Sequence, residues 1–104
     1  MAEQTTMNRA ERTAEHAALV AAAVRRHAAA RPGQAVLVVG HSNTVPAIVA
    51  ALGGPRLPDL CDAAYATLFV VRPAAGAVPA ATVRAQYGRP DAPEADACPA
   101  ASTR

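Results

Sequence analysis

The spacing of apolar residues changes from a helical pattern to a continuous run near Gln34. Between residues 8 and about 30, one side of a predicted helix carries Leu19, Val20, Ala23, Val24 and His27. Residues 36–39 are four consecutive branched apolar residues, which is typical of a strand buried on both faces. We therefore expect a long helix, a short link and then a buried strand.

A polar turn and a second helix are predicted after this strand. Asn43 or Thr44 can cap a helix that has Pro46 in its first turn and that ends at Gly53. The free N–H groups and the dipole at the start of such a helix attract anions. Because His41 stands at the rim of this turn, the sequence predicts an anion site where the strand meets the helix.

Two further stretches predict a β-hairpin. Residues 65–72 are rich in strand-forming side chains, and residues 82–87 alternate between apolar and polar. Gly76, in the connection between them, can adopt a positive φ. The expected order is therefore helix, buried strand, helix and β-hairpin.

The two ends of the chain differ in composition from its middle. Residues 1–7 are polar, and we expect them to be frayed. Residues 89–104 are rich in Pro, Ala and Asp without a large apolar side chain, so we expect disorder. One small α/β domain is predicted over residues 8–88.

Composition and charge exclude several classes of function. Of the 104 residues 52% are hydrophobic, but 29 are Ala, so few large side chains remain for a core. The net charge of +2 is too small and too dispersed to indicate a nucleic-acid-binding protein. No apolar run approaches ~20 residues, and the N-terminus lacks the basic-then-apolar order of a signal peptide. We therefore expect a cytoplasmic protein that binds neither nucleic acid nor membrane.

Cys61 and Cys98 do not have the spacing of a metal site. Reduced thiols are the expected state in the cytoplasm, and one disulfide bond is the alternative. We expect no metal and no cofactor.

The run VLVVGHSNTVPAIVAALGG, with the apolar strand that follows and Gln86-Tyr87-Gly88, resembles the C-terminal half of the histidine phosphatase superfamily. These are the phosphoglycerate-mutase-like proteins, and the resemblance covers roughly residues 34–88. It implies a partial three-layer α/β/α sandwich that lacks the N-terminal strand of the family. It also implies phosphomonoester hydrolysis or phosphoryl transfer, with a phosphorylated small molecule as the partner.

The resemblance also implies roles for individual residues. Residues 5–15 are similar to the family segment S-x-L-x-R-A-x-x-T-A-E, which implies that Arg9 contacts the substrate phosphate. His41 matches the second active-site histidine of the family, which contacts the phosphate as well. The predicted phosphate-binding set is completed by the turn residues Ser42, Asn43 and Thr44. Positions 10 to 40, 31 in number, separate Arg9 from His41, where the family has several dozen; the upstream match is either shortened or accidental.

The nucleophile of the family has no counterpart in this sequence. Members of the family begin with a strand that ends in Arg-His-Gly, and this histidine takes the phosphoryl group. The sequence contains no Arg-His-Gly, and its nearest string, Arg26-His27-Ala28, lies inside the predicted long helix. His16 is expected on the helix surface, and the general acid of the family also lacks a match.

Two interpretations follow from these departures. The chain is a fragment or a degenerate relative that hydrolyses phosphate esters poorly, or a non-catalytic protein that binds phosphorylated ligands. In either case, the missing N-terminal strand leaves an apolar sheet edge open, through which the chain can associate with itself.

The string from Gly40 to Thr44 also resembles the G-x-S-x-G nucleophile elbow of α/β-hydrolases. Thr44 occupies the position of the last glycine, where a side chain crowds the strained turn. No histidine follows His41 in the sequence to complete a Ser–Asp–His order. A serine hydrolase would therefore need a histidine from another chain.

Overall fold

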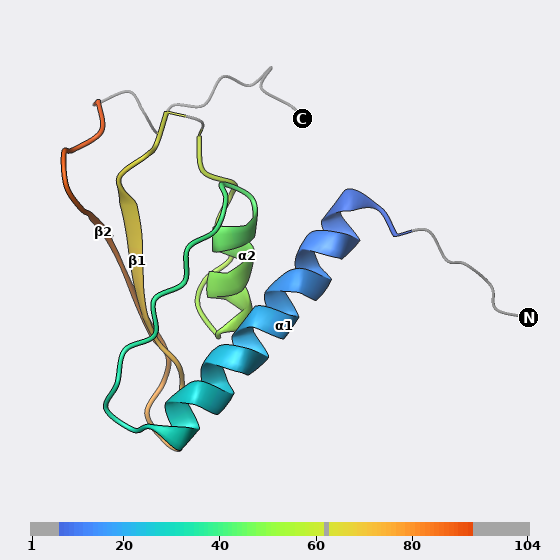
Figure 1. Cartoon of the computed structure of the whole chain (residues 1–104), viewed down its shortest axis with the longest axis vertical. Helices are drawn as coiled ribbons and strands as arrows, with labels where there is room; N and C mark the ends of the chain where they lie inside the picture. The colour runs from blue at the N-terminus through green and yellow to red at the C-terminus, as the bar shows by residue number, and fades with distance from the viewer. Residues whose placement is uncertain (1–6, 62, 93–104) are drawn as a thin grey trace, which may run out of the picture.

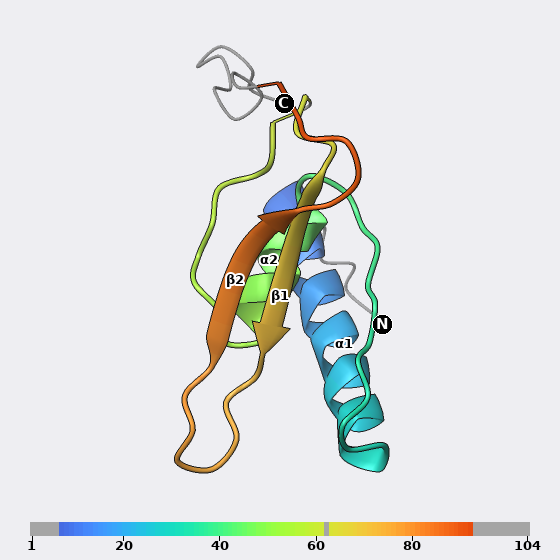
Figure 2. The ribbon, with the colours of Figure 1, turned by 90° about the vertical axis from the view of Figure 1, so that its left-hand side faces the viewer.

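The computed structural model describes residues 7–61 and 63–92 of the chain. In chain order they form helix α1 (Arg9–Ala30), helix α2 (Thr44–Ala51), strand β1 (Thr67–Arg72) and strand β2 (Ala81–Gln86) (Figure 1). Both helices lie on one side of the two-stranded sheet, behind the hairpin in Figure 2, and α1 packs on α2. The described residues are a small mixed α/β domain, as predicted, and the third layer of the expected sandwich stays a prediction.

Helix α1 begins with the capping pattern that its sequence favours. The side chain of Asn8 accepts a hydrogen bond from the Glu11 N–H at 2.8 Å, and the Glu11 carboxylate accepts one from the Asn8 N–H at 2.9 Å. This reciprocal capping box satisfies backbone donors that the first helical turn leaves unpaired. At the other end, Gly33 has a φ of 85°, which lets the chain reverse direction after the helix.

Small side chains let α1 and α2 approach each other closely. Ala17 and Ala21 of α1 are 2% and 1% exposed, and they form one cluster with Ile48 and Leu52 of α2. Val71 of β1 packs against this cluster and so attaches the hairpin to the helices. The core is centred on the contact between the two helices.

The hairpin forms where the sequence predicts it, with strand bounds moved by one or two residues. Strands β1 and β2 pair antiparallel, with Thr67 opposite Gln86 and Arg72 opposite Ala81. Gly76, in the loop, has the expected positive φ, of 57°. The guanidinium of Arg84 lies 5.8 Å from the ring centroid of Phe69 across the strand pair, which is cation–π distance.

The predicted buried strand at residues 36–39 is wrong. Residues 35–40, here called the extended segment, run beside α1 without forming a strand (Figure 2). Leu37 and Val39 are 80% and 85% exposed. A continuous apolar run indicates a buried strand only where neighbouring strands and a layer on each face cover it. Among the described residues β1 and β2 pair with each other, and no strand pairs with the extended segment.

The predicted terminal segments fall mostly outside the described residues. This holds for residues 1–6 of the frayed start and for residues 93–104 of the disordered tail. Asp91 belongs to the described part of that tail, and its carboxylate accepts hydrogen bonds from the backbone N–H groups of Tyr65 at 2.9 Å and Ala66 at 3.1 Å. These bonds fasten residues just after β2 to the start of β1.

Cys61 is disulfide-bonded, which differs from the expectation of reduced thiols. The other cysteine of the sequence, Cys98, lies outside the described residues. Neither of the two described helices is long and apolar enough to cross a membrane.

A buried hydroxyl offers a test of the packing between the hairpin and the rest of the domain. Thr82 Oγ1 is buried and has no hydrogen-bond partner among the described residues. The Thr82→Val variant replaces this hydroxyl by a methyl group of similar shape. We expect its free energy of unfolding to rise by about 1 kcal/mol, because the cost of burying an unpaired hydroxyl disappears. Urea unfolding followed by circular dichroism measures the change.

The matched control is Thr82→Ser, which keeps the hydroxyl and removes the methyl group. Its free energy of unfolding should fall, because apolar packing is lost while the unpaired hydroxyl stays. A Thr82→Val variant less stable than the wild type would show that the hydroxyl is paired in solution.

Candidate anion-binding site

The starts of α1 and α2 lie at the same end of the molecule (Figure 1). A chain of two hydrogen bonds connects them. Asn43 Nδ2 donates to Thr13 Oγ1 at 3.4 Å, and Thr13 Oγ1 donates to the carbonyl of Arg9 at 3.0 Å. The two segments from which the sequence predicts phosphate contacts are therefore brought to one end of the domain.

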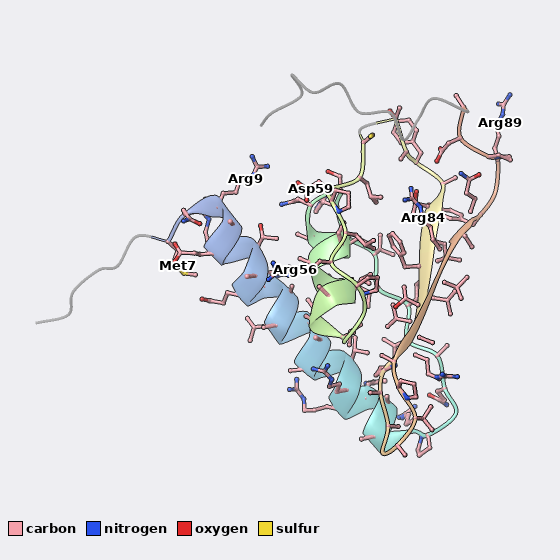
Figure 3. The ribbon with its side chains drawn as sticks, turned by 180° about the vertical axis from the view of Figure 1, so that it is seen from behind. Met7, Arg9, Arg56, Asp59, Arg84 and Arg89 are labelled. Carbon is pink, nitrogen blue, oxygen red and sulfur yellow. The ribbon has the colours of Figure 1, made fainter. Side chains whose placement is uncertain are left out.

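The charged and polar groups of this end are open to solvent. Arg9, His41 and Ser42 are exposed, whereas Asn43 and Thr44 are half-buried. Figure 3 shows the Arg9 side chain extending outward from the first turn of α1. Within the described part of the chain, no hydrogen bond or ion pair engages its guanidinium. Its five N–H donors are thus available to an anion.

The turn before α2 uses most of its own hydrogen-bonding groups. Thr44 Oγ1 accepts from the His41 N–H at 2.8 Å. The His41 carbonyl accepts from the N–H groups of Thr44 and Val45 at 3.2 and 3.0 Å. Pro46 has no N–H to offer. The first turn of α2 therefore presents no free amide at Thr44, Val45 or Pro46.

Fewer groups of this turn are consequently available to an anion than the sequence predicts. Among the described residues, the N–H groups of Ser42 and Asn43 have no hydrogen-bond partner and remain available. Thr44 closes the turn with its side chain, while Arg9 and His41 can contact a ligand with theirs. Of the predicted phosphate-binding residues, Thr44 therefore shapes the turn, and the others offer groups to a ligand.

The turn leaves no room for a side chain at position 40, which is occupied by Gly40. A Cβ atom built on it would lie 2.8 Å from Thr44 Oγ1 and 3.1 Å from Val45 Cγ2. The short distance to Thr44 Oγ1 arises because that hydroxyl folds back to accept the His41 N–H. A glycine before the turn thus permits the bond that holds the His41 backbone in place.

Two residues of this end were not predicted as part of a site. Thr13 lies within the segment that resembles the phosphatase motif, so this resemblance could have identified Thr13 as part of the site. Asp59 lies in the connection between α2 and β1. The Leu60 N–H donates to the Ser42 carbonyl at 3.0 Å, which brings the neighbouring Asp59 close to the turn. Figure 3 shows Asp59 at the same end of the molecule as Arg9.

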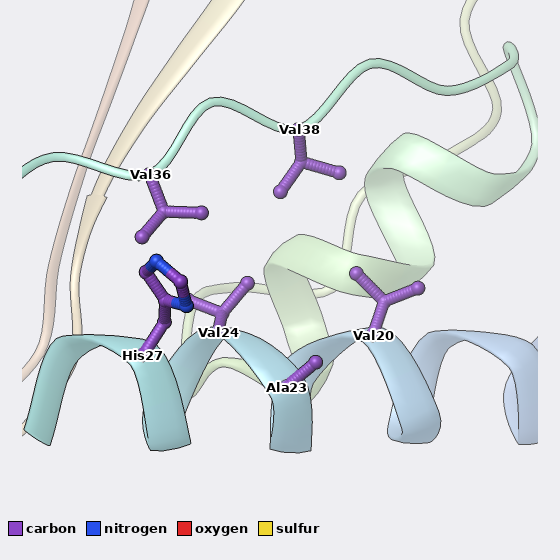
Figure 4. A pocket seen from close by; sticks show the side chains of 6 residues that line it. All are labelled: Val20, Ala23, Val24, His27, Val36 and Val38. Atoms are coloured by element: carbon purple, nitrogen blue, oxygen red, sulfur yellow. The ribbon is translucent and has the colours of Figure 1, made fainter. Parts of the chain in front are cut away.

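A pocket of about 270 Å³ lies elsewhere, between α1 and the extended segment (Figure 4). Apolar side chains and one imidazole line it: Val20, Ala23, Val24, His27, Val36 and Val38. None of the predicted phosphate-binding residues contributes to it. In the described ranges, no group of three potential metal ligands comes together.

Comparisons with family models, with curated proteins and with solved structures find no match to this chain. The likeness to histidine phosphatases therefore stays an interpretation of sequence motifs.

The steric role of Gly40 generates a prediction for stability. The Gly40→Ala variant should lower the free energy of unfolding by about 1–3 kcal/mol, because the added methyl group overlaps Thr44 Oγ1. The Thr44→Ala variant removes that oxygen, so Gly40→Ala should cost less when made in that background. Urea unfolding of the wild type, both single variants and the double variant gives the coupling energy. Additive costs would contradict the proposed overlap.

Proposed function

We propose that this chain binds the phosphate group of a phosphorylated small molecule at the turn formed by residues 41–44. The observation that carries the proposal is the hydrogen-bonded link from Asn43 through Thr13 to Arg9. It joins the two segments that resemble the phosphate-binding segments of histidine phosphatases. A guanidinium, an imidazole and two unpaired amide groups thereby lie at one end of the domain.

The chemistry of these groups suits a phosphate. The guanidinium of Arg9 can donate two parallel hydrogen bonds to phosphate oxygens. His41 can donate one hydrogen bond from its ring, and the amides of Ser42 and Asn43 can donate two more. Because Arg9 is exposed, water screens its charge, and the nearby Asp59 carboxylate opposes an anion. We expect weak binding as a result.

The distances along α1 argue against efficient phosphoryl transfer by the described residues. A covalent mechanism needs a nucleophile in line with the phosphorus atom. At about 1.5 Å per residue, the 18 positions from Arg9 to His27 correspond to roughly 27 Å of helix. His27 therefore lies far from the proposed site, in the last turn of α1. His16 is exposed two turns into the helix.

We accordingly propose a protein with the phosphate-binding half of a histidine-phosphatase site and little hydrolytic activity. The second candidate is a non-catalytic binder of phosphorylated ligands, which uses the same groups. The absence of an Arg-His-Gly string from the sequence favours weak turnover in both cases.

The cytoplasmic location that goes with this proposal stays a prediction. The disulfide bond at Cys61 counts against it, because disulfides persist mainly in oxidising compartments.

Phosphate binding can be measured residue by residue. In an NMR titration with inorganic phosphate, the amide signals of Ser42 and Asn43 should move most. Those of Thr44 and Val45 should move less, because their N–H groups already donate to the His41 carbonyl. The His41→Ala variant should raise the dissociation constant about tenfold, the effect of losing one hydrogen bond to a charged group.

The matched control is His16→Ala, which removes a histidine from the exposed face of α1 without touching the turn. Its dissociation constant for phosphate should equal that of the wild type. Shifts confined to residues outside 40–46, or equal weakening by both histidine variants, would place the anion elsewhere.

Turnover is a separate prediction. With an aryl phosphate as substrate, the purified chain should show a kcat below about 10⁻³ s⁻¹, since loss of a nucleophile removes most of the catalytic rate. Robust activity that disappears in His41→Ala, with phosphohistidine trapped on a histidine of this chain, would show that a nucleophile is present after all.

A further inference from the structure

The extended segment is neither helix nor strand, and its backbone has no hydrogen-bonding partner among the described residues. Its residues 35–40 make no backbone hydrogen bond to any described residue. The flanking residues do form such bonds, since Gln34 N donates to the Arg31 carbonyl and the His41 carbonyl accepts from Val45 N. A row of unpaired N–H and C=O groups of this kind is a template for pairing with another strand.

The side chains of the extended segment alternate as in a sheet. Val36 and Val38 point toward α1 and line the pocket there (Figure 4). Leu37 and Val39 alternate with them and are 80% and 85% exposed. The segment contains no charged residue and no proline, the features that usually protect an open edge from pairing.

An apolar surface continues from the segment onto one side of α1. With about 3.6 residues per turn, Leu19 lies about 160° around the helix from Ala17 and from Ala21. These alanines pack on α2, so Leu19 faces away from α2 and from the hairpin attached to it. Leu19 is 66% exposed. A strand added on the outer flank of the extended segment, away from β1, would cover Leu19 as well.

Among residues 7–61 and 63–92, which the structure describes, no further segment is suited to that position. The described strands β1 and β2 already pair with each other. By sequence, residues 1–6 and 93–104 contain no Val, Leu, Ile, Phe or Tyr. A second copy of the chain, in contrast, always carries a strand of matching length and apolar character. The outer flank of the extended segment, together with Leu19, is therefore a specific candidate surface for the self-association that the sequence predicts.

We propose that two copies of this chain dimerise by pairing their extended segments antiparallel about a twofold axis, on the flank that carries Leu19. A twofold axis between adjacent antiparallel strands places a residue opposite its own copy. The register is therefore centred on Leu37 or on Val38. Either register sets helix-facing side chains opposite helix-facing ones. The register centred on Leu37 pairs Leu37 with its own copy and Val39 with Ala35, and the register centred on Val38 pairs Leu37 with Val39. Because the paired stretch is uncharged, no like charges meet in either register.

The expected dimer is weak. Strand pairing covers Leu37 and Val39 only from the side. Complete burial of the six side chains of Leu19, Leu37 and Val39 in two copies, which would remove roughly 400–700 Å² from water, is therefore an upper limit. This area is below that of standard specific interfaces, about 1,200–2,000 Å², and is typical of a weak, transient contact. We expect a dissociation constant of roughly 10–100 μM.

Sedimentation equilibrium on the full chain between about 5 μM and 1 mM tests the proposal, which does not depend on phosphate binding. The wild type should fit a monomer–dimer equilibrium. The Leu37→Lys/Val39→Lys double variant should raise the dissociation constant tenfold or more, because lysines on a paired edge repel each other. Both positions are exposed, so the circular dichroism spectrum should not change.

Two matched variants identify the surface. Leu19→Lys should weaken the dimer as well, whereas Val70→Lys should not, because Val70 is exposed on β1, away from the outer flank. A wild type that is monomeric at 1 mM, open-ended assembly instead of a dimer, or a dimer disrupted by Val70→Lys and not by Leu37→Lys/Val39→Lys would each overturn the proposal.

Discussion

The close contact between α1 and α2 is the interaction on which the rest of this domain depends. Ala17 and Ala21 are almost completely buried there, against Ile48 and Leu52. Alanine side chains allow two helix backbones to come near each other, but each contributes little apolar area. A second link at the far end of α2 supports the contact, where the Arg25 guanidinium donates to the Ala51 carbonyl at 2.9 Å. These contacts bring the starts of both helices to one end, and thereby assemble the candidate site.

The same alanine-rich core explains why part of the apolar sequence stays exposed. The few large side chains are divided among the two helices, the hairpin and the extended segment. Leu52, at the end of α2, and Val71 of the hairpin pack against the helix contact. The extended segment reaches only the rim of α1, where a pocket separates Val36 and Val38 from the helix. Its outward side chains, Leu37 and Val39, are left without cover. An uncovered apolar strand of this kind is a surface for association.

The candidate site combines two physical effects that compete for the same backbone groups. A tight turn before a helix is stable when its N–H groups are paired, and an anion site needs them unpaired. Here the His41 carbonyl accepts hydrogen bonds from the amides of Thr44 and Val45, and Thr44 Oγ1 accepts one from the amide of His41. Most amides of the turn therefore stabilise the turn itself. Binding of an anion depends on Arg9, on the His41 ring and on the amides of Ser42 and Asn43.

What the sequence by itself determined are the features that depend on near neighbours along the chain. The extent of α1, the start of α2 and the hairpin around Gly76 were predicted, because turns and side-chain periodicity act over a few residues. The side chain of Asn43, one of the two predicted caps of α2, makes no capping hydrogen bond. Only the tertiary structure decided whether residues 36–39 would be a buried strand, because burial depends on neighbours supplied by distant parts of the chain. It likewise decided that Thr13 and Leu60 fasten the turn, since those hydrogen bonds join residues far apart in sequence.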